Sequence, residues 1–291
     1  MAVYAATNRT LLLAIGFSLA AATGCLGLDD GTRSPAEASR AITADNKLSM
    51  NKLSMNKLSM NKLSLNGITL DPVALAGLDE TAEGQEVLEF LVRCALPAGD
   101  ELVLEDADGA VVRAFPGSLG VAPEWRDGPL SASGKRWVTA CLLAHVNAFS
   151  ASVQISLRGP HPALAASAAE RHEYAVQEAA FYGDLFDGDG EAYACTGSAP
   201  PAGRASSDDL ALRVCARDSD GDGTTDCGMV ASGACGASGH EPRACEDRHG
   251  SDGAFARCHP ASLPPRALRA DGARHDEVVT TYLRQSDDGH R

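Results

Sequence analysis

The folded part of this 291-residue chain must accommodate eight cysteines spread between residues 94 and 258. A ninth cysteine, Cys25, stands apart near the N-terminus. Eight is an even number, and in a chain destined for an oxidising compartment such a set favours disulfide bonds over free thiols. We therefore expect disulfides among Cys94, Cys141, Cys195, Cys215, Cys227, Cys235, Cys245 and Cys258.

The N-terminal residues have the pattern of an export signal. Arg9 precedes an apolar run from Leu11 to Ala22, about half of the roughly 20 residues that span a bilayer. The sequence Ala-Thr-Gly-Cys at residues 22–25 then resembles the lipobox of bacterial lipoproteins, in which small residues precede a cysteine that is acylated. The resemblance implies a signal peptide over residues 1–24 and a fatty-acid (palmitate) membrane anchor on Cys25. The alternative is an ordinary signal peptide, with Cys25 as a spare thiol.

Residues next to the predicted lipidation site indicate the membrane to which the protein is sorted, and the net charge indicates its partners. Ala22 departs from the Leu usual in a lipobox, and Leu26 stands where inner-membrane lipoproteins of some bacteria carry Asp. The resemblance thus implies the outer membrane or the cell surface. Loss of residues 1–24 removes Arg9 alone and moves the formal net charge from −14 to −15. Such a surface repels nucleic acid and favours calcium or cationic partners.

The tract NKLSMNKLSMNKLSMNKLSLN, residues 46–66, repeats one five-residue unit. In a helix its leucines would be offset by about 140°, and in a strand an odd period inverts the face at each unit. The tract loosely resembles pentapeptide-repeat proteins, but it would build only one coil where solenoids need about three stacked units. It also holds four of the chain's five lysines. We interpret residues 25–66 as a lipidated linker; the alternative is that the lysines bind surface phosphates or acidic polysaccharide.

A helix and a hairpin are predicted where the folded body begins, near Gly67. From Thr81 to Cys94 apolar residues recur at the spacing of a helix with one buried face. Residues 101–115, ELVLEDADGAVVRAF, then indicate two strands around a tight Asp-Gly turn. Asp106 and Asp108 are therefore interpreted as turn residues and not as a catalytic carboxylate pair.

A second helix is predicted from Ser133 to Asn147, with Ser133 as its N-cap. Cys141 lies on the inner face of this helix, and Cys94 lies on the inner face of the first. A disulfide between Cys94 and Cys141 is the simplest use of both.

Alternating and apolar segments predict strands. Residues 150–159, SASVQISLRG, place Ser152, Gln154 and Ser156 opposite an apolar face, which is typical of a half-buried strand. Further strands are predicted at Ala179–Phe186 and Glu277–Leu283. Interleaved helices and strands favour an α+β fold with a small mixed body.

The composition changes near residue 190, where Gly, Ser, Pro and Asp begin to dominate and large aliphatic residues become sparse. Such a segment needs disulfides in place of an apolar core, so we expect its six cysteines to pair among themselves, in sequential order. The C-terminal region is thus predicted to be disulfide-rich and loop-dominated. The predicted divisions are a signal peptide (1–24), a linker (25–66), an α+β body (67–189), a cysteine-rich region (190–265) and a C-terminal strand and tail (266–291).

The sequence DSDGDGTTD, residues 218–226, carries the best candidate metal site. Alternate aspartates followed by Gly223 resemble the start of EF-hand-like calcium loops and the acidic repeats of thrombospondin type 3 modules. Side chains in this pattern can converge hard oxygens on Ca²⁺. The predicted ligands are Asp218, Asp220, Asp222, the Thr224 carbonyl and, through water, Asp226. Met229 replaces the bidentate Glu of an EF-hand, and the alternative is a solvated acidic turn.

Other candidate sites are weaker. FDGDGE, residues 186–191, repeats the acidic pattern less fully, with Asp187, Asp189 and Glu191. A zinc site could be built from Cys245, His249, Cys258 and His259. In an exported chain, however, such cysteines are more often joined in disulfides. Ser118, in PGSLG, lacks the full G-x-S-x-G elbow and would need His145 or His172 to form a hydrolase site.

Three stretches look similar to predicted secreted proteins of Gram-negative soil bacteria: VRCALPAG, RWVTACLLAHVNAFSASVQISLRG and FYGDLF. The resemblance implies export and a shared body, and it carries no activity. We expect a lipid-anchored surface protein with a binding, adhesion or envelope-structural role; the alternative is an exported hydrolase. Expected partners are the membrane, through the N-terminal lipid, and surface polysaccharide or another envelope protein, but not nucleic acid.

Overall fold

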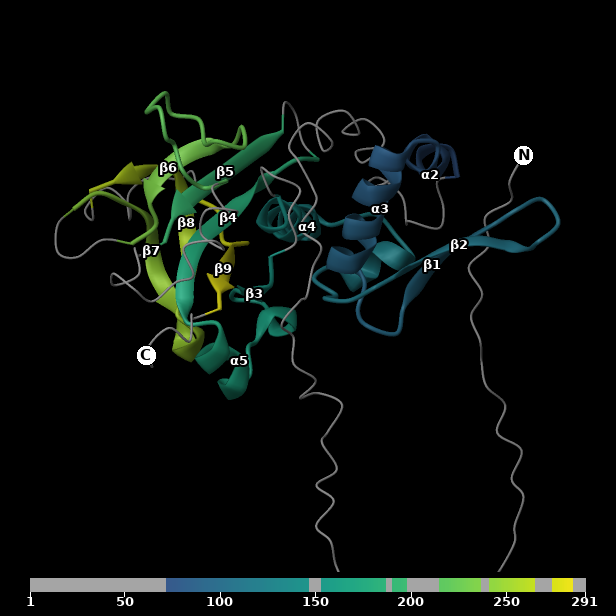
Figure 1. The fold of residues 1–291 in the computed structure, drawn as a ribbon, viewed down its shortest axis with the longest axis horizontal. Helices are drawn as coiled ribbons and strands as arrows, with labels where there is room; N and C mark the ends of the chain where they lie inside the picture. The colour runs from purple at the N-terminus through teal and green to yellow at the C-terminus, as the bar shows by residue number, and fades with distance from the viewer. Residues whose placement is uncertain are drawn as a thin grey trace, which may run out of the picture.

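The computed structural model describes residues 72–146, 153–186, 190–197, 215–236, 241–264 and 274–284. These residues form interleaved helices and strands with disulfides in the C-terminal part, so the α+β prediction is confirmed (Figure 1). The predicted signal peptide, Cys25 and the repeat tract lie outside the described residues, as do Asp187 and Asp189.

The helices are α2 (Pro72–Asp79), α3 (Ala82–Ala95), α4 (Ala132–Ala144) and α5 (Ala168–Glu173). The strands are β1 (Glu101–Glu105), β2 (Val111–Pro116), β3 (Ile155–Arg158), β4 (Val176–Asp184), β5 (Glu191–Thr196), β6 (Val230–Ala234), β7 (Arg243–His249), β8 (Ala254–Leu263) and β9 (Val279–Leu283). Short 3₁₀ turns occupy Pro123–Arg126, Pro162–Leu164 and Gly250–Asp252.

Serine and threonine caps fix the starts of the two main helices. Thr81 caps α3 by accepting a hydrogen bond from the Gly84 N–H at 3.0 Å, so the first predicted helix is confirmed. Helix α4 is also confirmed, but its N-cap is Ser131, which accepts from the Gly134 N–H at 3.0 Å. The assignment of Ser133 as the cap was wrong, because Ser131 has the extended backbone that a cap requires and Ser133 already lies in the first turn.

Strands β1 and β2 form the predicted hairpin, with Leu102 opposite Phe115. At its turn, Asp106 Oδ1 accepts hydrogen bonds from the N–H groups of Asp108 and Ala110, both at 2.9 Å. Gly109 has a φ of 79°, which only Gly adopts without strain. The turn role predicted for the two aspartates is confirmed, and Figure 1 shows the hairpin reaching away from the helices.

A five-stranded sheet in the order β3-β9-β4-β5-β6 forms the centre of the molecule. All neighbours are antiparallel except β5 and β6, which are parallel. Strand β9 (Val279–Leu283) confirms the predicted C-terminal strand and lies between β3 and β4, so the last described strand is an interior strand of the sheet. The strand predicted at Ala179–Phe186 is also confirmed, beginning earlier, at Val176.

The sheet is a middle layer, buried on both faces. Ala179 and Phe181 of β4 share a core with α3 and α4, and α4 packs directly on β4 and β9. Ala180 and Tyr182 face the other way, into a second core with residues of the β7–β8 hairpin. Figure 1 shows this arrangement, with α4 between the sheet and α3 and the β7–β8 hairpin on the opposite side. In the part of the chain that is described, no helix has the length and apolarity to cross a membrane.

Strand β3 is buried at every position, so the prediction of a half-buried strand was wrong. Its alternation is as expected: Ile155 and Leu157 face the main core. The polar face, however, is covered by α5, where Glu170 accepts a hydrogen bond from Ser156 Oγ at 2.8 Å. A polar residue can be buried when its hydrogen bonds are made inside the protein, which sequence alternation alone does not reveal.

Arg158 is the charged centre of this buried face. Its Nε donates to Ser156 Oγ at 3.0 Å, and another guanidinium N–H donates to the carbonyl of Tyr174. The guanidinium also lies 3.7 Å from the centroid of the Tyr282 ring. Burial lowers the pKa of Arg158, and the nearby charge of Glu170 partly offsets this effect. We call Arg158, Ser156 and Glu170 the buried polar network.

Candidate functional site

The eight cysteines of the folded body form four disulfides: Cys94–Cys141, Cys195–Cys235, Cys215–Cys227 and Cys245–Cys258. The predicted bond between the inner faces of α3 and α4 is confirmed. The six C-terminal cysteines pair among themselves, also as predicted.

Sequential pairing of those six was wrong for the first four. Parallel pairing of β5 with β6 sets Thr196 beside Ala234, which brings the neighbouring residues Cys195 and Cys235 together. Cys215 and Cys227 then close a separate loop within the connection between the two strands. Only Cys245–Cys258 follows the predicted order. The sequence does not reveal which distant strands are neighbours, so it could not rank these pairings.

The loop closed by Cys215–Cys227 contains the acidic motif and is wrapped around Asp218. One oxygen, Oδ1, accepts from the N–H groups of Gly221 at 2.7 Å and Asp222 at 3.1 Å, while Oδ2 accepts from Gly223 N–H at 3.0 Å. Both glycines have positive φ angles, 77° and 88°, which let the backbone fold around the carboxylate. The aspartate thus organises its own loop through backbone amides.

The carboxylates of Asp218, Asp220 and Asp222 converge. One oxygen from each lies within 4.8 Å of the others, and Asp220 and Asp222 are exposed. Each ionised carboxylate offers about four lone-pair sites, so the amide bonds leave capacity for an ion. Hard oxygens at this spacing are the ligand type that Ca²⁺ takes. We call these three side chains the acidic cluster.

The acidic cluster does not include Asp226, which was predicted to act through water, or the predicted Thr224 carbonyl. Asp226 accepts from the N–H and Oγ of Ser219, at 3.1 and 2.8 Å, and so ties the two ends of the loop together. Thr224 pairs through its backbone with Val230. Met229, at the position of the EF-hand glutamate, is fully buried in the main core. Its role is to anchor the loop to the body.

The two weaker chemical alternatives gain no support. Both sulfurs of the suggested zinc site, Cys245 and Cys258, are joined to each other, and His259 lies 3.3 Å from a Glu246 oxygen. Ser118 lies in the loop after β2 and donates its backbone N–H to the carbonyl of Leu96. His145 ends α4, with Nδ1 2.8 Å from the Cys141 carbonyl, and His172 lies in α5.

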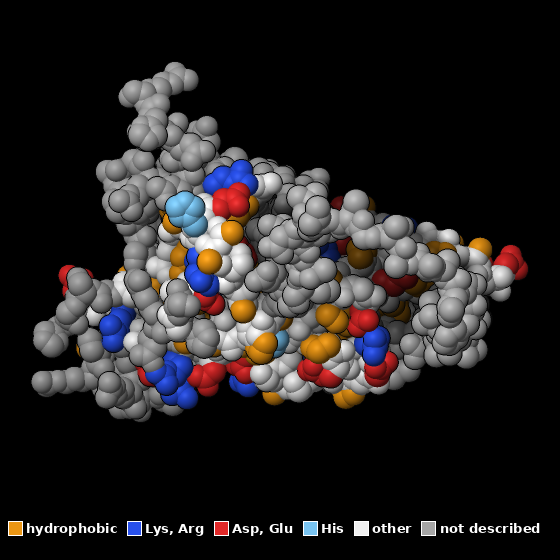
Figure 2. All heavy atoms as spheres, turned by 90° about the horizontal axis from the view of Figure 1, so that it is seen from below, with side chains coloured by type: hydrophobic (Ala, Val, Ile, Leu, Met, Phe, Trp, Pro, Cys, Tyr) orange, Lys and Arg blue, Asp and Glu red, His pale blue; other side chains and the backbone are white. Residues whose placement is uncertain are grey.

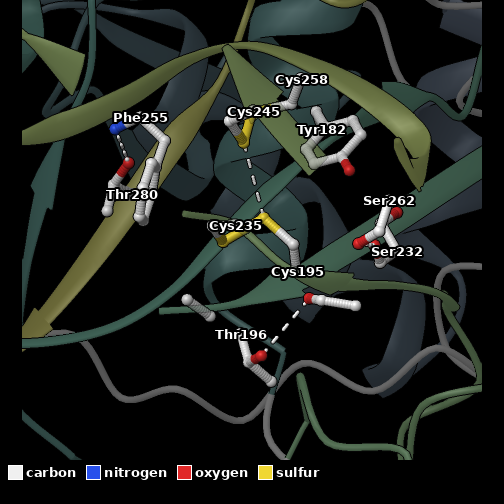
Figure 3. The surroundings of a disulfide bond; sticks show 12 residues. Tyr182, Cys195, Thr196, Ser232, Cys235, Cys245, Phe255, Cys258, Ser262 and Thr280 are labelled. Atoms are coloured by element: carbon white, nitrogen blue, oxygen red, sulfur yellow. Dashed lines mark hydrogen bonds between the residues drawn. A yellow bond between two sulfur atoms is a disulfide. The ribbon is translucent and has the colours of Figure 1, made fainter. Parts of the chain in front are cut away.

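A contact between two of the disulfides was not predicted from the sequence. The Sγ atoms of Cys195 and Cys245, from two different disulfides, lie 3.7 Å apart (Figure 3). Cys195, Cys235, Cys245 and Cys258 are all buried, each at most 2% exposed. We call them the four-sulfur cluster. It arises because the β7–β8 hairpin packs on the sheet, a long-range contact that no local pattern signals.

Aromatic and polar side chains enclose the four-sulfur cluster. Tyr182 donates its hydroxyl to the His259 carbonyl at 2.6 Å, and burial raises the pKa of this phenol. The Phe255 N–H donates to Thr280 Oγ1 at 2.8 Å, which joins β8 to β9. Figure 3 shows Tyr182 and the Phe255–Thr280 pair beside the sulfurs. These two hydrogen bonds join β4 and β9 to β8 beside the cluster.

Comparison of the chain with protein-family models, curated proteins and solved structures gave no match. The function of the chain must therefore be inferred from its own residues and their geometry.

Proposed function

We propose that the protein is an exported, lipid-anchored surface protein with a binding, adhesion or envelope-structural role. The observation that carries the proposal is the pairing of all eight body cysteines in disulfides. Disulfides form and persist in oxidising compartments and are rare where thiols are kept reduced. The lipobox-like sequence before Cys25 supplies a tether, and residues 26–66 supply a spacer of up to about 140 Å if extended.

The chemistry of the described surface favours binding over catalysis. His145, the base suggested for Ser118, is 1% exposed and packs against the Phe90 ring, so it is poorly placed to meet a substrate. On the face drawn in Figure 2, basic and acidic side chains of the described residues are interspersed. Charges of opposite sign also pair, as in Arg171–Asp252 and Arg126–Asp100. Such a surface suits contacts with polar partners better than with a polyanion.

Replacing Cys25 by Ser should move the protein from the membrane fraction to the soluble fraction. A serine has no sulfur to carry the lipid, and a chain without its lipid would lose the tether. Fractionation and metabolic labelling with a fatty-acid analogue measure both effects. Leu28→Ser is the matched control and should remain labelled and membrane-bound. A wild-type chain that is unlabelled and soluble would rule out the anchor.

We further propose that the acidic cluster holds calcium. The convergence of three carboxylates in a loop closed by Cys215–Cys227 supports this, because a constrained loop loses less entropy when it binds an ion. The loop lacks a bidentate Glu, so we expect a dissociation constant on the order of 10⁻⁴ to 10⁻³ M, the range of extracellular modules. Only a calcium-rich exterior would fill such a site.

Calcium at about ten times its dissociation constant should stabilise the wild-type protein by about 1.4 kcal/mol. An Asp220→Ala, Asp222→Ala double variant should lose this gain, together with the heat of binding in a calorimetric titration. The control is Glu101→Ala with Asp108→Ala, which removes the same charge from exposed positions of the β1–β2 hairpin. Equal calcium responses in the two double variants would reduce the motif to a solvated acidic turn.

A further inference from the structure

The four-sulfur cluster brings together two disulfides from different layers of the fold. Cys195 lies in β5 and Cys235 follows β6, whereas Cys245 and Cys258 face each other across the β7–β8 hairpin. Backbone hydrogen bonds fix this placement: the Cys235 N–H donates to the Thr196 carbonyl at 2.8 Å, and the Cys245 N–H donates to the Cys235 carbonyl at 2.9 Å. The 3.7 Å contact between Cys195 Sγ and Cys245 Sγ is thus held from both sides.

Neither of these disulfides links the sheet to the β7–β8 hairpin. The bond Cys195–Cys235 stays within the β5–β6 side, and Cys245–Cys258 stays within the hairpin. A bond between Cys195 and Cys245 would join the two layers covalently. The contact between these two sulfurs is the one that exchange chemistry requires, since a thiolate must reach a disulfide sulfur to attack it.

We propose that the four-sulfur cluster is a site of intramolecular thiol–disulfide exchange that produces a Cys195–Cys245 bond. In the first step an external dithiol reduces Cys245–Cys258, giving two cysteine thiols while the dithiol is oxidised to its own disulfide. In the second step the Cys245 thiolate attacks Cys195 Sγ. The Cys195–Cys235 bond breaks as Cys195–Cys245 forms, and Cys235 leaves as a thiolate that takes up the proton released by Cys245.

Through the exchange, reduction of the hairpin disulfide leads to a new disulfide between the hairpin and β5. After the second step the free thiols are on Cys235 and Cys258, and the hairpin is cross-linked to β5. The contact between the two layers therefore becomes covalent after the hairpin has lost its own disulfide. Burial of all four cysteines disfavours their thiolate forms, so the exchange is slow and responds to sustained reduction.

Cys258→Ser tests the second step without any reductant. This variant leaves the Cys245 thiol in contact with the intact Cys195–Cys235 bond. After acid quenching, unfolding and alkylation, peptide mapping should find the Cys195–Cys245 bond, with roughly half of the free thiol on Cys235, because exchange between two similar disulfides is near balance. Cys235→Ser tests the same contact from the other side, since its Cys195 thiol should attack Cys245 and free Cys258.

Cys227→Ser is the matched control, because its partner Cys215 belongs to the separate acidic loop. Its free thiol should stay on Cys215. A Cys195–Cys245 bond in either folded variant, with the control unchanged, supports the exchange. If the Cys258→Ser variant keeps all of its thiol on Cys245 and the Cys235→Ser variant keeps all of its thiol on Cys195, the proposal is wrong.

Discussion

Replacing Cys94 and Cys141 together by Ala is expected to lower the free energy of unfolding by about 4 kcal/mol. The bond joins α3 to α4 across a sequence separation of 47 residues, so its loss releases a long loop in the unfolded chain. Both residues are fully buried. Alanine is preferred to serine here because it leaves no hydroxyl without a hydrogen-bond partner in the core. Urea unfolding followed by circular dichroism measures the change.

The matched control for this prediction is the loss of Cys215–Cys227, whose separation is only 12 residues. The same reasoning gives about 3 kcal/mol for this shorter loop. The double alanine variant at Cys215 and Cys227 should therefore retain more stability than the variant at Cys94 and Cys141. The reverse order would show that loop closure in the unfolded chain does not govern the effect of these bonds.

Arg158→Met should lower the free energy of unfolding by about 3–5 kcal/mol, because it leaves the Glu170 carboxylate buried without its compensating cation. Arg158 is 3% exposed and Glu170 is 2% exposed, and Ser156 Oγ connects them by hydrogen bonds. Methionine keeps most of the side-chain volume, so the change tests charge more than packing. Thermal and urea unfolding both report the loss.

A double-mutant cycle with Glu170→Gln separates charge from packing in the buried polar network. Gln keeps a hydrogen-bond acceptor for Ser156 and removes the unpaired charge, so the double variant should be more stable than Arg158→Met alone. Strictly additive losses would mean that the two charges do not interact. Arg126→Met is the surface control: Arg126 bonds Asp100 and Asp127 in solvent, and its loss should leave the unfolding midpoint nearly unchanged.

Local patterns in the sequence predicted local structure well. The apolar spacing after Thr81 gave α3, and the Asp-Gly turn gave the β1–β2 hairpin. The disulfide between α3 and α4 could be predicted because the apolar spacing of each helix places its cysteine on the buried face. The error at Ser133 is of the same local kind, since two serines near one helix start offer competing caps and only the backbone angles decide between them.

Features that depend on distant neighbours were beyond the sequence. The burial of Ser156 depends on α5, and the pairing of Cys195 with Cys235 depends on the parallel contact of β5 with β6. The candidate calcium loop shows both cases. Alternation predicted the convergence of Asp218, Asp220 and Asp222, but it did not reveal the hydrogen bonds that Asp226 accepts from Ser219.

The interior position of β9, between β3 and β4, limits the order in which the sheet can be assembled. All five residues from Val279 to Leu283 are buried, and they bridge β3 to β4. Synthesis proceeds from the N-terminus, so β3 and β4 emerge long before the strand that must lie between them. Until Leu283 has emerged, the sheet lacks the strand that pairs with both β3 and β4. The sheet therefore cannot be completed before nearly all of the described chain has been synthesised.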